Sequence, residues 1–99
     1  MKSVALCLDG ELSIYRAAAL KELVLAPLGP DTLLELDLAG VTDIDSAGLQ
    51  LLMLAKQTAL AAGGDVRLCA ASAPVLDLLA LLGLSTAFAA APAAQGAAQ

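Results

Sequence analysis

Two carboxylates and one hydroxyl fall within four residues near the middle of the chain, at Asp43, Asp45 and Ser46. Paired carboxylates can act as a general acid and base, or as metal ligands. This pair has no histidine and no third carboxylate to complete such a site, and no base stands ready to activate the serine. We therefore expect neither catalysis nor a bound metal ion. Capping and solvation are the simpler roles, above all for Asp43.

The segments on either side predict a corner between a strand and a helix. Residues 34–38 (LELDL) alternate apolar and acidic side chains, as a half-buried strand does. Residues 49–60 contain strong helix formers and neither Gly nor Pro. The Asp45-Ser46 pair thus stands where a helix N-terminus needs a side-chain oxygen for its free N–H groups. Gly48 allows a close approach to the first turn, and the helix dipole favours negative charge at Ser46.

Composition limits the class of protein. With 99 residues, 60% of them hydrophobic, the chain is long enough for one small domain with an aliphatic core. Its formal net charge is −5, and its five Lys and Arg residues do not cluster, which argues against nucleic-acid binding. Cys7 and Cys69 lie in apolar runs without CxxC spacing, so we expect buried thiols rather than metal ligands.

No segment has the pattern of a signal peptide or of a membrane span. The run after Lys2 is too short for a signal peptide. The strongly apolar stretch 75–84 is too short to cross a bilayer, and the chain beyond it is rich in weakly hydrophobic alanine. We expect a cytoplasmic domain without membrane insertion.

The remaining elements follow from local patterns. Asp9-Gly10 between two apolar runs predicts a β-hairpin over 4–15. A helix should follow over 17–28, and a strand over 66–70 should complete a right-handed βαβ unit with the corner helix. Ser72 and Pro74 begin a last helix that Gly83 ends. Residues 86–89 could add a short edge strand, and 90–99 form a low-complexity, frayed tail.

The sequence Asp45-Ser46-Ala47-Gly48-Leu49, after a Leu-rich strand, resembles the signature of the STAS domain family, which includes the bacterial anti-sigma factor antagonists. Further matches are Gly10-Glu11-Leu12, Ala18-Ala19-Leu20-Lys21 and Leu82-Gly83-Leu84, so the resemblance spans about residues 4–84. Arg16 departs from it, because many relatives have a helix-capping Thr there. The resemblance implies an α/β domain over 1–89, with a mixed central sheet and helices mainly on one face.

For function, the resemblance implies a switch operated by phosphorylation of Ser46, with Asp45, Asp43 and Gly48 supporting it. The unphosphorylated protein would bind a kinase-like anti-sigma factor and so act on transcription. It would need no cofactor of its own, because ATP belongs to the kinase. Two alternatives remain open: a regulatory subunit that docks on the ATPase of a lipid-transport ABC complex, and a chemotaxis or other signalling-cluster protein.

The corner helix also suggests where a partner binds. It is apolar around most of its circumference, so its buried side is not fixed by its pattern. If Leu51, Leu52 and Ala55 face the sheet, then Leu49, Gln50 and Met53 form an exposed apolar patch beside Ser46. The alternative is that these residues are covered by the C-terminal segment.

Overall fold

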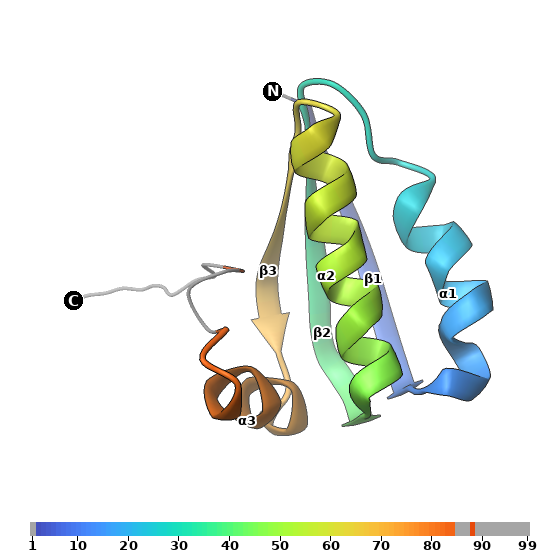
Figure 1. The fold of residues 1–99 in the computed structure, drawn as a ribbon, viewed down its shortest axis with the longest axis vertical. Coiled ribbons are helices and arrows are strands. Elements are labelled where there is room, and N and C mark those ends of the chain that lie inside the picture. The colour runs from blue at the N-terminus through green and yellow to red at the C-terminus, as the bar shows by residue number, and fades with distance from the viewer. Residues whose placement is uncertain (1, 85–87, 89–99) are drawn as a thin grey trace.

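The computed structural model describes residues 2–84 and residue 88. Strands and helices alternate along the chain, as in the α/β class that the sequence predicts (Figure 1). The elements are β1 (Lys2–Leu12), α1 (Ile14–Leu25), β2 (Thr32–Ile44), α2 (Ser46–Ala61), β3 (Asp65–Ala71) and α3 (Ala73–Leu81). The expected edge strand at 86–89, apart from Phe88, and the tail at 90–99 lie outside the described residues.

The three described strands form one sheet in the order β1-β2-β3, and both neighbouring pairs are parallel. The β2-α2-β3 unit therefore has the parallel strands that were expected. The predicted hairpin and the mixed sheet are wrong for this part of the chain. Residues 2–12 make a single strand that runs alongside β2, and α1 already begins at Ile14.

The Asp9-Gly10 step is a bulge within β1 instead of a turn. The register with β2 shifts between Cys7 and Asp9 and again between Gly10 and Glu11. Gly10 has the positive φ of 74° that the Asp-Gly signal predicted, but a bulge can use that conformation as well as a hairpin can. The Arg16 guanidinium holds the bulge, because its Nη1 donates to the carbonyl oxygens of Asp9 and Glu11, each at 2.7 Å.

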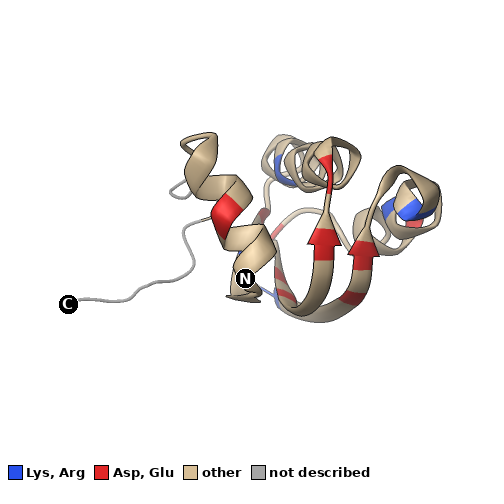
Figure 2. Cartoon of the chain, turned by 90° about the horizontal axis from the view of Figure 1, so that it is seen from below, with Lys and Arg blue, Asp and Glu red and all other residues tan. Residues whose placement is uncertain are grey.

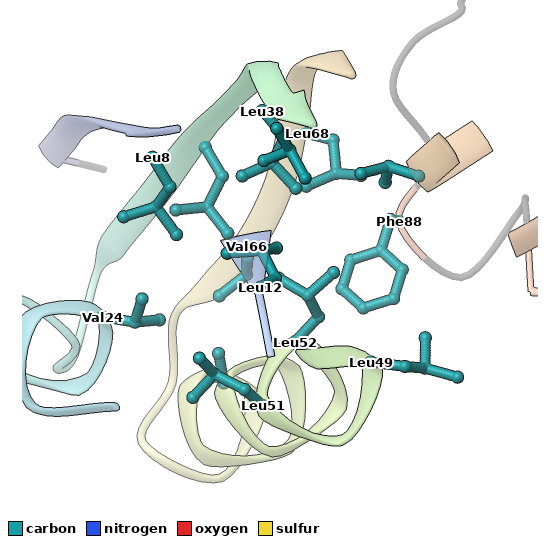
Figure 3. Packing of buried hydrophobic residues seen from close by; sticks show 14 of the residues in the cluster. Leu8, Leu12, Val24, Leu38, Leu49, Leu51, Leu52, Val66, Leu68 and Phe88 are labelled. Carbon is teal, nitrogen blue, oxygen red and sulfur yellow. The ribbon is translucent and has the colours of Figure 1, made fainter. Parts of the chain in front are cut away.

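The core lies between the sheet and the two long helices. Alternate leucines of β2 at 34, 36 and 38 are fully buried, and each contributes about 1.5–3 kcal/mol by leaving water. Helices α1 and α2 lie side by side over this face, as Figures 1 and 2 both show. Leu52 of α2 and Val24 of α1 meet the sheet leucines there (Figure 3). Helix α3 packs against β2 through this core, with Val75 and Leu79 buried.

The opposite face of the sheet is not covered by any helix that the structure describes (Figure 2). Glu35 and Asp37 lie on it, half exposed, as the alternation of β2 predicted. Cys7 and Cys69 are exposed, so the expectation of buried thiols is wrong. Their strands pair with β2 from opposite sides, and the helices bury only one of the two sheet faces. None of the described helices has the length and hydrophobicity needed to span a membrane.

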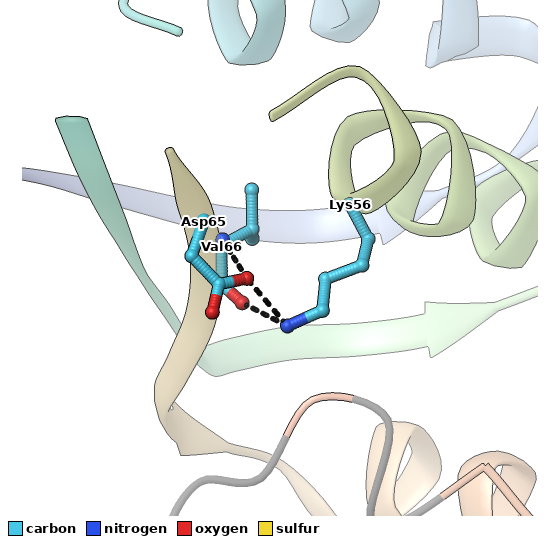
Figure 4. A network of polar contacts seen from close by, with 3 residues as sticks. All are labelled: Lys56, Asp65 and Val66. Carbon is cyan, nitrogen blue, oxygen red and sulfur yellow. Dashed lines mark hydrogen bonds and ion pairs between the residues drawn. The ribbon is translucent and has the colours of Figure 1, made fainter. Parts of the chain in front are cut away.

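An ion pair joins the C-terminal half of α2 to the start of β3. Lys56 Nζ lies 2.6 Å from Asp65 Oδ1 and also donates to the carbonyl oxygen of Val66 at 3.0 Å (Figure 4). Burial, the largest influence on Asp65, raises its pKa. The Lys56 ammonium, the Val66 N–H and the Arg67 charge together outweigh it, so the pKa of Asp65 is lowered.

Candidate functional site: the corner between β2 and α2

Asp45 caps two helices with one carboxylate. Its Oδ1 accepts a hydrogen bond from the backbone N–H of Gly48 at 3.1 Å, which makes it the N-cap of α2. Its Oδ2 accepts from the backbone N–H of Ile14, the first residue of α1, at 3.3 Å. The Gly48 bond is the largest influence on the pKa of Asp45 and lowers it. Desolvation opposes this shift, and the Ile14 bond adds to it, so the net pKa is below its ordinary value.

Ser46 is the first residue of α2, exposed to solvent. Because Asp45 supplies the cap, Ser46 is not the structural N-cap that a serine at such a corner often is. No hydrogen bond of its hydroxyl is found within residues 2–84 and 88. The hydroxyl is therefore exposed at a helix N-terminus and makes no structural contact in the described part of the chain.

Gly48 lets the first turn of α2 lie directly against the end of β1. A Cβ atom built on Gly48 would come within 2.2 Å of the Leu12 carbonyl oxygen and 2.8 Å of the Leu12 Cβ. That same carbonyl oxygen accepts the backbone N–H of Asp45 at 3.2 Å. The close approach expected at Gly48 is therefore to Leu12, and it fixes the Asp45-Ser46 corner on the sheet.

Asp43 is exposed near the C-terminal end of β2, where its Oδ1 accepts a hydrogen bond from the N–H of Ile44 at 2.9 Å. In the sheet it pairs with Glu11 of β1, so the carboxyl ends of the two strands carry negative charge together. Figure 2 looks at this end of the molecule and shows acidic positions at the strand tips. Among the described residues, no group of three or more His, Cys, Asp or Glu side chains is placed to hold a metal ion.

The expected partner patch on α2 is only partly exposed. Leu49 is 7% exposed and belongs to the core, so its placement on the surface is wrong. Met53 is half buried and packs against that core, and of the three residues only Gln50 is exposed. Phe88, 2% exposed, lies in the same cluster as Leu49, and its ring is drawn near Leu49 and Leu52 in Figure 3. Residue 88 therefore covers this side of α2, which is the alternative that the sequence left open.

A family model described as "Mlab, STAS domain" matches residues 1–90. The chain belongs to the STAS domain family. The STAS domain of a SulP transporter from Vibrio cholerae has the same fold, with a TM-score of 0.68 at 20% identity over 99% of this chain and 73% of that one. No curated protein matches the sequence.

The surface that this STAS domain leaves open beside Ser46 is a groove between α1 and α2, with a volume of about 330 Å³. Four residues from each helix line it: Ile14, Ala17, Ala18 and Lys21 from α1, and Ala47, Gln50, Leu51 and Leu54 from α2. Ile14 is 67% exposed and its neighbour Tyr15 92% exposed, so two large side chains lie uncovered at the start of α1.

Sequence reasoning missed this groove in the STAS domain for an identifiable reason. The hairpin prediction assigned Ile14 and Tyr15 to a strand, so the first turn of α1 was absent from the predicted helix. The signal was nevertheless present. Residues 14, 17, 18 and 21 and residues 47, 50, 51 and 54 share the i, i+3, i+4, i+7 spacing that defines one face of a helix.

Proposed function

We propose that this STAS domain is a phosphorylation-switched protein-interaction domain of the anti-sigma factor antagonist type, acting in the cytoplasm. Unphosphorylated, it binds a kinase-like anti-sigma factor; once that partner has phosphorylated Ser46, the complex dissociates. The observation that carries the proposal is that Asp45 and Ser46 have different roles at the corner between β2 and α2. Asp45 caps both helices, while the exposed Ser46 hydroxyl is left without a structural role in the described chain.

The fold itself tolerates a phosphate at Ser46. A phosphoserine carries about −1.5 to −2 charges at neutral pH. It would stand at the N-terminus of α2, where the helix dipole stabilises an exposed negative charge by roughly 0.3–1 kcal/mol. Since the Ser46 hydroxyl is exposed, no buried packing is displaced.

The partner is affected differently. A protein that covers this corner must remove water from the phosphate, and without a cation of its own this desolvation costs several kcal/mol. Asp43 and Asp45 add like charge within three residues of Ser46. Each 1.4 kcal/mol lost lowers the affinity about tenfold, so a modest penalty is enough to act as a switch.

The test is calorimetric titration of the candidate kinase-like partner with wild-type, phosphorylated and Ser46→Asp protein. We expect the last two to bind at least about tenfold more weakly, with melting curves close to wild type. Ser3→Asp is the matched control, because Ser3 is also exposed but lies near the start of β1, away from the corner. Unchanged affinity for both the phosphoprotein and Ser46→Asp would overturn the switch.

A second candidate is a regulatory subunit of a membrane-transport complex, such as a lipid-transport ABC assembly. It is favoured by the Mlab description of the matching family model and by the transporter origin of the similar solved domain. Affinity purification of the tagged chain from its native cells distinguishes the candidates. A histidine-kinase-like ATPase supports the first proposal, an ABC ATPase supports the second, and a chemoreceptor-type complex supports the signalling-cluster alternative.

A further inference from the structure

Strand β1 lies at the edge of the sheet, and its outer side has no partner among the described residues. Lys2 donates its backbone N–H to the carbonyl oxygen of Asp31, just before β2, at 2.6 Å. Because backbone groups alternate in direction along a strand, those of Ser3, Ala5 and Cys7 point away from β2. None of the backbone hydrogen bonds in the turns and loops of the described chain uses these three residues. Their N–H and C=O groups are therefore free to pair with another strand.

The chain covers only the second half of this edge. Arg16 Nη1 donates to the carbonyl oxygens of Asp9 and Glu11, so α1 occupies the edge near the carboxyl end of β1. The 12 residues of α1 extend for about 18 Å, whereas the 11 residues of β1 extend for about 36 Å, so α1 ends about half-way along the strand (Figure 1). Residues 3–7 contain neither charge nor proline, the features that usually keep an edge strand from pairing.

The hydrophobic core is incomplete on the same side. Two rows of core-facing side chains cross the three strands, Val4-Leu34-Val66 and Leu6-Leu36-Leu68. The members that come from β2 and β3 are at most 2% exposed. The members that come from β1, Val4 and Leu6, are only half-buried. A strand that pairs with β1 and carries apolar side chains two residues apart would complete both rows.

We propose that this strand is β1 of a second copy, antiparallel to the first and related to it by a two-fold axis perpendicular to the sheet at Ala5. Ala5 then lies opposite Ala5 of the other copy, and Ser3 lies opposite Cys7. In an antiparallel pair such opposed residues exchange both backbone hydrogen bonds, so the outward groups of all three residues are satisfied. The two sheets join into one, with the helices of both copies on the same side.

The side chains match in this register. On the core face, Val4 of each copy lies opposite Leu6 of the other, so both apolar rows continue from one sheet into the next. On the open face, Ser3 meets Cys7 and Ala5 meets its own copy, and all of these side chains are small and uncharged. No pair of like charges is therefore brought together along residues 3–7.

Two observations favour a second copy over an unrelated strand. Each copy carries the same unpaired edge, so a single two-fold contact closes both edges at once. The uncovered stretch also has the length that pairs with itself. A shift of two residues toward the carboxyl end would place Ser3 opposite Asp9, whose carbonyl oxygen Arg16 already holds. Because the paired stretch is short, we expect a reversible dimer that depends on protein concentration.

Sedimentation-velocity ultracentrifugation of the full 99-residue chain under reducing conditions, from micromolar to millimolar concentration, should show monomer and dimer in exchange. Ala5→Pro removes the outward N–H at the centre of the interface in both copies, but no donor of the ladder with β2. This variant should dimerise at least about tenfold more weakly than wild type. Ala5→Ser keeps the backbone N–H at the same position, so it is the matched control and should dimerise as wild type does.

A disulfide tests the register. Cys69→Ala leaves Cys7 as the only thiol of the chain, and Ser3→Cys in that background adds a second one. Within one copy the two positions are about 13 Å apart along the strand, too far for a disulfide. Across the interface they lie opposite each other, with about 5.5 Å between the Cα atoms. Oxidised glutathione should therefore link the double variant into a covalent dimer through position 3 and Cys7, while Cys69→Ala alone stays monomeric on a denaturing gel.

Circular-dichroism melts establish that each variant is folded, and the disulfide decides the question if Ala5→Pro is not. A monomer at millimolar concentration overturns the proposal, as do assemblies larger than a dimer or a dimer that folded Ala5→Pro leaves intact. Failure of position 3 to link to Cys7 overturns the antiparallel register. The inference does not depend on the Ser46 switch. Residues 3–7 pair with residues 33–37, at the end of the sheet away from Ser46, so Ser46→Asp should leave the dimer intact.

Discussion

The carboxylate of Asp45 accepts the backbone N–H of Ile14, a residue 31 positions earlier in the chain. Ser13, the residue at the N-cap position of α1, makes no side-chain capping bond, so the cap of α1 comes from the start of α2. One side chain therefore sets the positions of both helix N-termini, of the groove between them and of the Ser46 hydroxyl. This double contact gives Asp45 a defined physical role beside the candidate phosphorylation site.

Substitution of Asp45 should destabilise the domain more than substitution of Asp43. Asp45→Asn keeps one acceptor oxygen and can cap only one of the two helices, and Asp45→Ala caps neither. Asp43 accepts only the N–H of the adjacent Ile44, so Asp43→Asn should leave the melting temperature near wild type. Thermal melts of the three variants should give the order Asp43→Asn, Asp45→Asn, Asp45→Ala from most to least stable. A different order would mean that the double cap is not what holds the corner.

Stability should fall in acid through Asp45 and Asp65. Both carboxyls have pKa values lowered from the ordinary 3.8 in the folded protein. A lowered folded pKa means that the unfolded chain binds protons first. The stabilisation is therefore fully present above the unfolded pKa and is lost as pH falls through the folded values.

Urea unfolding measured from neutral pH down to about pH 3 should show this loss. In the acid range, the free energy of unfolding should fall less steeply with decreasing pH for Asp45→Asn than for wild type, because that variant has no proton to take up at residue 45. Equal slopes for the two proteins would contradict the capping contacts as the cause of the lowered pKa.

Gly48→Ala should disrupt the corner. The added methyl group would lie 2.2 Å from the Leu12 carbonyl oxygen, so the first turn of α2 must move away from β1. We expect a loss of at least about 1–3 kcal/mol in the free energy of unfolding, as for overpacking in a tight core. Ser46→Ala, two residues earlier at an exposed helical position, is the control and should change it by less than about 0.5 kcal/mol. A stable Gly48→Ala protein would show that Leu12 and α2 are further apart.

Neighbouring residues on α2 should respond very differently to an introduced charge. Leu49→Glu removes a buried leucine and places a carboxylate in the core, which should cost about 2–5 kcal/mol. Gln50→Glu, at an exposed position that lines the groove, should change stability by less than about 0.5 kcal/mol. Chemical denaturation of both variants measures the difference. A stable Leu49→Glu protein would indicate that Leu49 lies at the surface, as part of the exposed patch that the sequence suggested.

Local sequence signals were enough to predict the buried side of β2, the corner between β2 and α2, and the family. The two-residue period of Leu34, Leu36 and Leu38 determined which side of β2 is buried, because side chains alternate across a strand whatever its neighbours are. The Asp45-Ser46 corner and the need for glycine at 48 also followed from the chain itself, since capping and helix start signals act within a few residues. The family signature lies in the same short segment, and the STAS family match agrees with it.

The tertiary structure decided everything that depends on distant partners. Asp9-Gly10 encodes a positive φ but not the direction of the strand that pairs beside it, so a hairpin and a bulge in a parallel strand were equally compatible with it. Helix α2 is apolar almost all round, so its periodicity could not show that Leu49 is buried while Gln50 lines the groove. The bond between Asp45 and Ile14 joins residues 31 positions apart, and no local preference specifies it. These contacts form only when the sheet brings two helix N-termini to the same edge.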